Sequence, residues 1–101
     1  MVLPRIGPRP DVAPQASIEG TLLRESNCLY LDIGDSLRLL AFYDGPINGT
    51  FDRTRGVLTV DGKSLSLGQR AAVSGGELGT MPDQAASCPP APAFVAAGLT
   101  N

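Results

Sequence analysis

The amino-acid sequence is interrupted by turn-forming residues so often that a long helix has no room to form. Short segments between the turns alternate apolar and polar residues with a period of two, as half-buried strands do. No apolar stripe with a period of 3.6 residues is long enough for a substantial helix. The turn signals are Ser26-Asn27, Gly34-Asp35-Ser36, Asp44-Gly45-Pro46, Asp61-Gly62, Gly68 and Gly75-Gly76. The chain is therefore predicted to be all-β.

Six short strands are predicted between these turns. Residues 28–33 alternate strictly, which indicates one buried face, whereas residues 37–43 alternate less strictly, as a strand covered on both faces does. The six segments are 17–25, 28–33, 37–43, 57–60, 63–67 and 70–74, the last of them closed by Gly75-Gly76. Strands this short, joined by close turns, predict a small antiparallel barrel of five or six strands, or a sandwich.

Three further segments are ambiguous. Residues 47–56 form an excursion with a short strand around Thr50-Phe51. Ala85-Ala86 and residues 91–97 are each compatible with one helical turn, and residues 93–97 equally with a closing strand.

A chain of 101 residues is the size of one domain. Residues 1–16 contain four prolines, which favour extended backbone over packed elements, so this segment is predicted to be a disordered leader or tether. Residues 17–79 are the predicted barrel body. Residues 80–101 form a Pro- and Ala-rich C-terminal segment.

The charge pattern disfavours two classes of partner. Eight basic and ten acidic residues give a net charge of −2 and are scattered singly. Nucleic-acid binding depends on clustered Lys and Arg, so we expect no nucleic-acid partner and no strong membrane-surface patch. No apolar run approaches the roughly 20 residues of a transmembrane helix, and the N-terminal prolines break any signal peptide. A lipid-anchored tether in a precursor remains open.

Gly62-Lys63-Ser64 has the three residues with which a phosphate-binding loop ends. Such a loop needs four residues between its first glycine and Gly-Lys-Ser, and it leads from a strand into a helix. Five residues separate Gly56 from Gly62, and a strand pattern follows Ser64. Asp61-Gly62 between apolar runs predicts a type I′ hairpin instead.

The chain contains no histidine, which removes Ser-His-Asp and Cys-His catalysis as well as histidine-containing metal sites. Two cysteines cannot complete a thiolate zinc site, and the alternating pattern of a calcium loop is missing. A carboxylate pair remains conceivable, but the acidic residues sit mostly in turn contexts. We expect no catalytic residue, metal or cofactor. The carboxylate candidates are Asp32, Asp35, Asp44, Asp52 and Asp61.

Cys28 and Cys88 are 60 residues apart, one in a predicted central strand and the other before Pro89-Pro90. In an envelope or extracellular protein two cysteines form one bridge, which would tie the C-terminal segment to the barrel. Two buried thiols are the alternative. The bridge is the prediction.

Two surface motifs have structural alternatives. Asn48-Gly49-Thr50 matches a glycosylation sequon, although in a bacterial protein it is interpreted as a turn. Aromatic residues with arginines nearby are typical of a binding face, but in a small β-domain they usually pack in the core. These residues are Tyr30, Phe42, Tyr43 and Phe51, with Arg38, Arg53 and Arg55.

A set of glycines and cysteines resembles small bacterial secreted or lipoprotein β-barrel domains of OB-like topology. The matching residues are Gly20-Thr21-Leu22, Cys28-Leu29-Tyr30-Leu31, Gly68-Gln69, Ala72-Val73-Ser74-Gly75-Gly76 and Cys88. The resemblance implies an OB-like barrel over residues 17–97, and such domains generally have no assigned activity. The aromatic stacking pair and basic groove of nucleic-acid-binding OB domains are missing.

The sequence therefore predicts a non-enzymatic bacterial domain of unknown specific function in the periplasm, the cell envelope or the extracellular space. Its expected partner is a protein or glycan, bound through residues 44–55, with Phe51, Arg53 and Arg55 as candidate contacts. The alternatives are a structural accessory domain whose sheet edge extends a neighbour's sheet, and an enzyme that uses a carboxylate pair.

Overall fold

The computed structural model describes residues 1–12 and 14–100 and contains eight strands and two 3₁₀ helices within them. Residues 13 and 101, which belong to the expected leader and C-terminal segment, lie outside the described residues. The elements are β1 (Ala16–Glu25), β2 (Cys28–Asp32), β3 (Leu37–Phe42), η1 (Pro46–Asn48), β4 (Thr50–Asp52), β5 (Val57–Val60), β6 (Lys63–Ser66), β7 (Arg70–Glu77), η2 (Asp83–Ala85) and β8 (Ala93–Thr100). The all-β prediction is confirmed.

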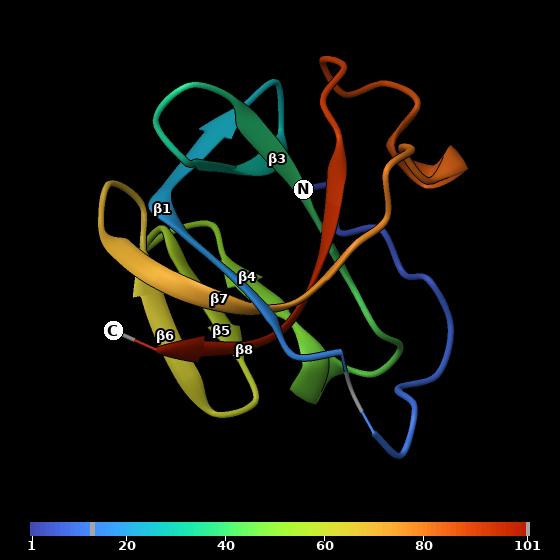
Figure 1. The fold of residues 1–101 in the computed structure, drawn as a ribbon. Coiled ribbons are helices and arrows are strands. Elements are labelled where there is room, and N and C mark those ends of the chain that lie inside the picture. Colours follow the sequence, from blue (N-terminus) through green and yellow to red (C-terminus); the bar gives the residue numbers. More distant parts are fainter. Residues whose placement is uncertain (13, 101) are drawn as a thin grey trace.

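Five strands close into a barrel in the order β1-β2-β3-β8-β7, with β7 returning to β1 (Figure 1). The long strand β1 pairs with β7 through its first half and with β2 through its second half. Four of the pairings are antiparallel, whereas β3 and β8 run parallel. A small barrel or sandwich of five or six antiparallel strands was predicted; the structure has a closed barrel of five strands, and the parallel pair is its one departure from antiparallel order.

The strands β4, β5 and β6 form a separate three-stranded antiparallel sheet, inserted between β3 and β7. The expected hairpin joins β5 to β6, with φ of 51° at Asp61 and 79° at Gly62, the positive values that a type I′ turn requires. The short strand expected around Thr50-Phe51 is β4. The segments 57–60 and 63–67 were predicted as barrel strands, and they belong to this second sheet instead.

One apolar core joins the barrel interior to the inserted sheet. All five barrel strands contribute to it, and so do β5 and β6, so the inserted sheet shares the core of the barrel. Its members are Leu22, Leu29, Leu31, Leu40, Phe42, Leu58, Val60, Leu65, Ala71, Val73, Phe94, Ala96 and Leu99.

A β-bulge resets the inward-facing side of β8. Gly98 stands opposite Ser74 and Ala96 opposite Gly75, so Ala97 is an extra residue in β8. Phe94 and Ala96 reach the interior before the bulge, and Leu99, three residues after Ala96, reaches it again. The strand β7 continues through Gly75-Gly76, where it was expected to end. A Cβ at Gly75 would lie 1.7 Å from the Val95 carbonyl oxygen, so only glycine allows this close pairing.

The strand β2 is buried on both faces, although its alternation predicts one exposed face. Leu29 and Leu31 point into the barrel, whereas Cys28 and Tyr30 join a second apolar cluster outside it. That cluster is covered by residues 78–92, which we call the cover segment; its buried residues include Ala85 and Cys88. β8 follows the cover segment and closes the barrel, so the structural body extends beyond the expected limit at residue 79.

The structure also differs from the expected disordered leader. The backbone of residues 1–7 runs beside β2 and β3: Val2 donates to the Asn27 carbonyl oxygen (2.9 Å), and Ile6 to that of Phe42 (3.0 Å). Phe42 in turn donates to the Pro4 carbonyl oxygen (2.8 Å). Pro4 is buried. Prolines permit this arrangement because they favour extended backbone and because Pro4 takes part through its carbonyl group alone.

Candidate functional site

The outer face of β2 and β3 is apolar and is covered by other parts of the chain. Cys28, Tyr30 and Leu39 point to that side and are 0% exposed. The cover segment lies over them. Val2 packs against the same cluster, and it belongs to residues 1–9, which we call the N-terminal stretch. This face is therefore occupied by the chain itself.

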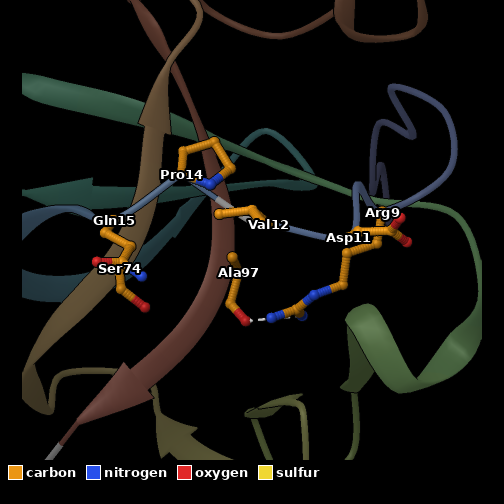
Figure 2. Close-up of a pocket in the computed structure, with 7 residues that line it drawn as sticks. All are labelled: Arg9, Asp11, Val12, Pro14, Gln15, Ser74 and Ala97. Carbon is orange, nitrogen blue, oxygen red and sulfur yellow. Dashed lines mark hydrogen bonds between the residues drawn. The ribbon is translucent and has the colours of Figure 1, made fainter.

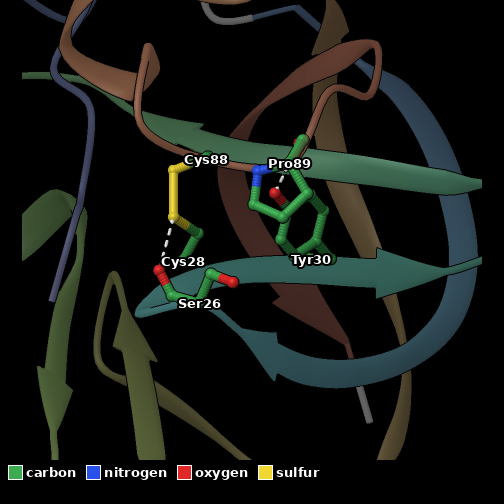
Figure 3. Close-up of a disulfide and its surroundings, with 5 residues drawn as sticks. All are labelled: Ser26, Cys28, Tyr30, Cys88 and Pro89. Carbon is green, nitrogen blue, oxygen red and sulfur yellow. Dashed lines mark hydrogen bonds between the residues drawn. A yellow bond between two sulfur atoms is a disulfide. The ribbon is translucent and has the colours of Figure 1, made fainter.

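The predicted disulfide between Cys28 and Cys88 is present, with Cα atoms 6.0 Å apart. Figure 3 shows the bond between β2 and the cover segment, with Tyr30 beside it. The Tyr30 hydroxyl donates a hydrogen bond of 2.6 Å to the Pro89 carbonyl oxygen, one residue after Cys88. Further along, Leu39 N–H donates to the Pro92 carbonyl oxygen (2.9 Å). A covalent bond and two hydrogen bonds thus attach the cover segment to β2 and β3.

The environment of Tyr30 favours its neutral form. Burial removes water from the phenol and raises its pKa above the usual 10.0, and the negative charge of Glu25 raises it further. The raised pKa marks a buried hydrogen-bond donor that holds the cover segment in place.

Arg5 attaches the N-terminal stretch to the connection after β3. Its Nη1 donates to the carbonyl oxygens of Tyr43 (3.0 Å) and Gly45 (3.2 Å), and its Nη2 donates to that of Gly49. The guanidinium lies 5.6 Å from the centre of the Phe42 ring, in cation–π range.

Gln84 holds the Arg5 backbone from the other side. Its Oε1 accepts from Arg5 N–H (2.8 Å) and its Nε2 donates to the Arg5 carbonyl oxygen (2.8 Å), as a paired strand would. Gln84 belongs to η2 in the cover segment. The N-terminal stretch and the cover segment therefore hold one another as well as the barrel.

Asn48 is a structural residue, as the interpretation of its sequon as a turn requires. It is 8% exposed, and its Nδ2 donates to the Asp44 carbonyl oxygen (2.6 Å). Its Oδ1 accepts from Arg9 Nη1 (3.2 Å), which also donates to the carbonyl oxygen of the bulge residue Ala97 (3.0 Å). The neighbouring Ile47, in contrast, is 66% exposed.

The predicted contact residues Phe51, Arg53 and Arg55 do not form one surface. Phe51 is half-buried and packs against the shared core, whereas both arginines are exposed in the turn between β4 and β5. Asp52 shapes this turn, since its Oδ1 accepts from the N–H groups of Thr54 (3.0 Å) and Arg55 (3.1 Å). The exposed side chains of the connection therefore include Arg53 and Arg55 in the turn after β4, and the apolar Ile47 in η1 before β4.

The other aromatic candidates pack in the protein interior, which confirms the packing interpretation. Tyr30 and Phe42 are fully buried and Tyr43 is 6% exposed. Arg38 forms an ion pair with Glu77 across the barrel surface, with Nε and Oε1 3.0 Å apart.

A shallow recess of about 380 Å³ lies beside the bulge in β8. Figure 2 shows Arg9 and Asp11 on one side, Pro14, Gln15 and Ser74 on the other, and Ala97 between them. Val12, which is 80% exposed, also lines it. Arg9 is held at its edge by the hydrogen bond to Ala97.

Three of the five carboxylate candidates, Asp32, Asp52 and Asp61, have local structural roles. Asp32 Oδ1 accepts from Gly34 N–H (2.9 Å), Asp52 closes the turn described above, and Asp61 is the first central residue of the β5–β6 hairpin. Among the described residues, no group of three or more Cys, Asp or Glu side chains is placed to hold a metal ion. Gly62-Lys63-Ser64 leads into β6, so it is a hairpin ending.

Sequence reasoning missed the hydrogen bonds that Arg5, Arg9, Asn48 and Gln84 form with distant parts of the chain or with neighbouring backbone. Most of their partners are backbone carbonyl and amide groups, which leave no residue pattern. The prolines beside Arg5 and Arg9 were a signal of extended backbone, but not of what it pairs with.

Comparison of the chain with models of protein families, with curated proteins and with solved structures finds no match. Within the part of the chain that the structure describes, no helix has the length and apolar character needed to cross a bilayer.

Proposed function

We propose that this protein is a non-enzymatic bacterial binding domain of the periplasm, cell envelope or extracellular space. It binds a protein or glycan partner through the connection 44–55. The observation that carries the proposal is the contrast between a covered β2–β3 face and an exposed, anchored connection. Ile47 is 66% exposed beside the buried Asn48, and Arg53 and Arg55 are exposed further along. Contact of the apolar Ile47 side chain with water is unfavourable, and a partner that covered this side chain would remove the contact.

The disulfide supports the location, because such bonds persist in oxidising compartments and are rare in the reducing cytosol. The N-terminal stretch is integrated into the domain from residue 1 to residue 7, so a lipid-anchored tether would have to lie upstream of it.

The alternative role, extension of a neighbour's sheet, has less support. A closed barrel has no edge strands, which leaves β4 and β6 of the inserted sheet. In β6, Ser66 N–H donates to Gln69 Oε1 (3.0 Å), and its carbonyl oxygen accepts from Gln69 N–H (3.0 Å). β4 has three residues and follows Gly49, whose carbonyl oxygen is taken by Arg5. Short, occupied edges discourage strand addition.

To test the proposal, purified wild type and variants are immobilised on a surface. A periplasmic extract, separated into a protein fraction and a glycan fraction, is passed over each of them, and the amount of bound material is measured. The variant Ile47→Asp/Arg53→Ala/Arg55→Ala is expected to lose bound material at least about tenfold, the result of removing interface contacts worth more than about 1 kcal/mol. Phe51 is left intact because it packs on the core.

The matched control is Glu19→Ala/Arg70→Ala, which removes an exposed ion pair on the β1–β7 surface. Exposed ion pairs contribute little to stability, so this control should bind as wild type does. Equal binding by the connection variant and wild type, with both folded by circular dichroism, would show that the connection is not the binding surface.

A further inference from the structure

The N-terminal stretch lies along a surface formed by the end of β3, the connection after it and the cover segment, and we call this surface the groove. The floor of this groove is the backbone at the end of β3 and just after it. Besides the bonds of Pro4 and Ile6 to Phe42, Asp44 N–H donates to the Gly7 carbonyl oxygen (2.9 Å). The pairing is parallel, with Arg5 opposite Phe42. One wall is Gln84 of the cover segment, which pairs with both backbone groups of Arg5. The groove thus accepts an extended segment much as a sheet edge accepts a strand.

The groove also has a specific position for an arginine side chain. Three carbonyl oxygens, those of Tyr43, Gly45 and Gly49, converge on the Arg5 guanidinium, and the Phe42 ring lies under it. A planar group with five donors satisfies such an arrangement better than an ammonium does. A Cβ at Gly49 would lie 2.5 Å from the Phe42 ring, so glycine keeps the ring and the carbonyl in place.

The connection from this stretch to the barrel is exposed, with Pro14 lying against Gly76 of β7. Arg9 is the last residue that anchors it to Asn48 and Ala97. Of residues 10–15, those that the structure describes are all exposed, and two of them are prolines. Six residues span at most about 20 Å, which is less than each of the molecular dimensions of 31 × 27 × 26 Å, so two exchanging copies would have to lie against one another.

From these observations we infer that residues 1–9 exchange between two copies of this chain, each copy inserting its segment into the groove of the other. The contacts of the segment are the same whether its own groove or a partner's receives it, so they do not oppose exchange. What opposes it is the effective concentration of the attached segment, in the millimolar range for a short flexible connection. Prolines stiffen the connection and lower that advantage.

The inference is tested on the full chain by refolding it at about 1 mM, within the range of that effective concentration, and at about 1 µM, far below it. The products are analysed by size-exclusion chromatography with light scattering. A dimer is expected after refolding at the higher concentration only. Arg5→Ala is expected to abolish the dimer, whereas Arg24→Ala, an exposed arginine of β1, should leave it unchanged.

The position of the segment is read in a dimer made from one isotope-labelled and one unlabelled chain. Contacts between Arg5 and the Phe42 ring are expected between chains, by isotope-filtered nuclear Overhauser measurements. A monomer at both concentrations would overturn the inference. A dimer in which the Arg5–Phe42 contact stays within each chain would overturn it equally, since the chains would then associate through another surface.

Discussion

Tyr30 combines a packing role with a polar one. Its ring is fully buried between β2 and the cover segment, and its hydroxyl donates to Pro89. A buried hydroxyl without this partner would cost more than the hydrogen bond contributes, so the two features depend on each other. The bulge residue Ala97 shows the same dependence in the backbone, because its carbonyl oxygen is satisfied by Arg9 from another part of the chain.

We expect Tyr30 to make the protein less stable in alkaline solution. Its pKa is raised in the folded state, so its contribution is fully present below about pH 10, the pKa of an unfolded tyrosine. The contribution is lost as the pH rises through the higher folded pKa. The measurement is urea unfolding between pH 7 and pH 11.5 for wild type and for Tyr30→Phe.

Tyr30→Phe should lose about 1 kcal/mol of unfolding free energy at pH 7, from the missing hydrogen bond and the carbonyl left behind. It should then decline less steeply than wild type above pH 10. An equal decline in both proteins would assign the alkaline instability to other groups.

Among the elements, the cover segment depends most on a single bond. It contains one 3₁₀ turn, η2, and no strand, and its apolar contacts form a cluster separate from the barrel interior. Elements with few backbone hydrogen bonds and their own small cluster tend to open locally before the protein unfolds. The Cys28–Cys88 bond opposes that opening.

Cys28→Ser/Cys88→Ser is therefore expected to open the cover segment while the barrel stays folded. Loss of a 60-residue cross-link lowers the unfolding free energy by up to about 4 kcal/mol in the chain-entropy view. Hydrogen exchange should increase more for residues 78–92 and for Leu39 N–H than for the β1–β7 pairing, which serves as the internal control. A uniform increase over both regions would show that the two clusters unfold together.

Elements with local signals were predictable from the sequence, and those defined by distant partners were not. Asp61-Gly62 specifies the β5–β6 hairpin by its own conformational preference. β8 is buried on both faces along Ala93 to Ala97, because the cover segment and Tyr43 lie outside it, and such an apolar run does not distinguish strand from helix. The pairing of residues 1–7 with β3 joins segments far apart in sequence, so prolines alone suggested a leader.

Some residues of the candidate site could likewise be predicted from the sequence, and others could not. Cys28 and Cys88 were predictable because only two cysteines exist to pair. Phe51 was assigned to a surface, yet its side chain packs on the core. Phe51 lies in β4 of the inserted sheet, where it stands opposite the buried Leu58. The face to which a strand residue points depends on this register rather than on residue type.

For the whole molecule, the shared core predicts that the barrel and the inserted sheet unfold together. Leu65 of β6 is fully buried in that core, so Leu65→Ala should cost about 2–5 kcal/mol. Leu67, which is 37% exposed, provides the control, and Leu67→Ala should cost less than about 1 kcal/mol. Chemical unfolding followed by far-ultraviolet circular dichroism and by tyrosine fluorescence should give one coincident transition. Two separate transitions would mean that the inserted sheet is an independent unit.

The parallel pair of β3 and β8 determines when this chain can fold. β3 is synthesised early, but its neighbour β8 begins 51 residues after the last residue of β3, Phe42, at Ala93. Closure of the ring therefore waits until residues 93–100 have left the ribosome, and the disulfide partner Cys88 emerges only shortly before them. Contacts so distant in sequence slow folding, because a long loop must close before they form. During synthesis the apolar strands β2 and β3 are exposed, which is the period when a chaperone has most to protect.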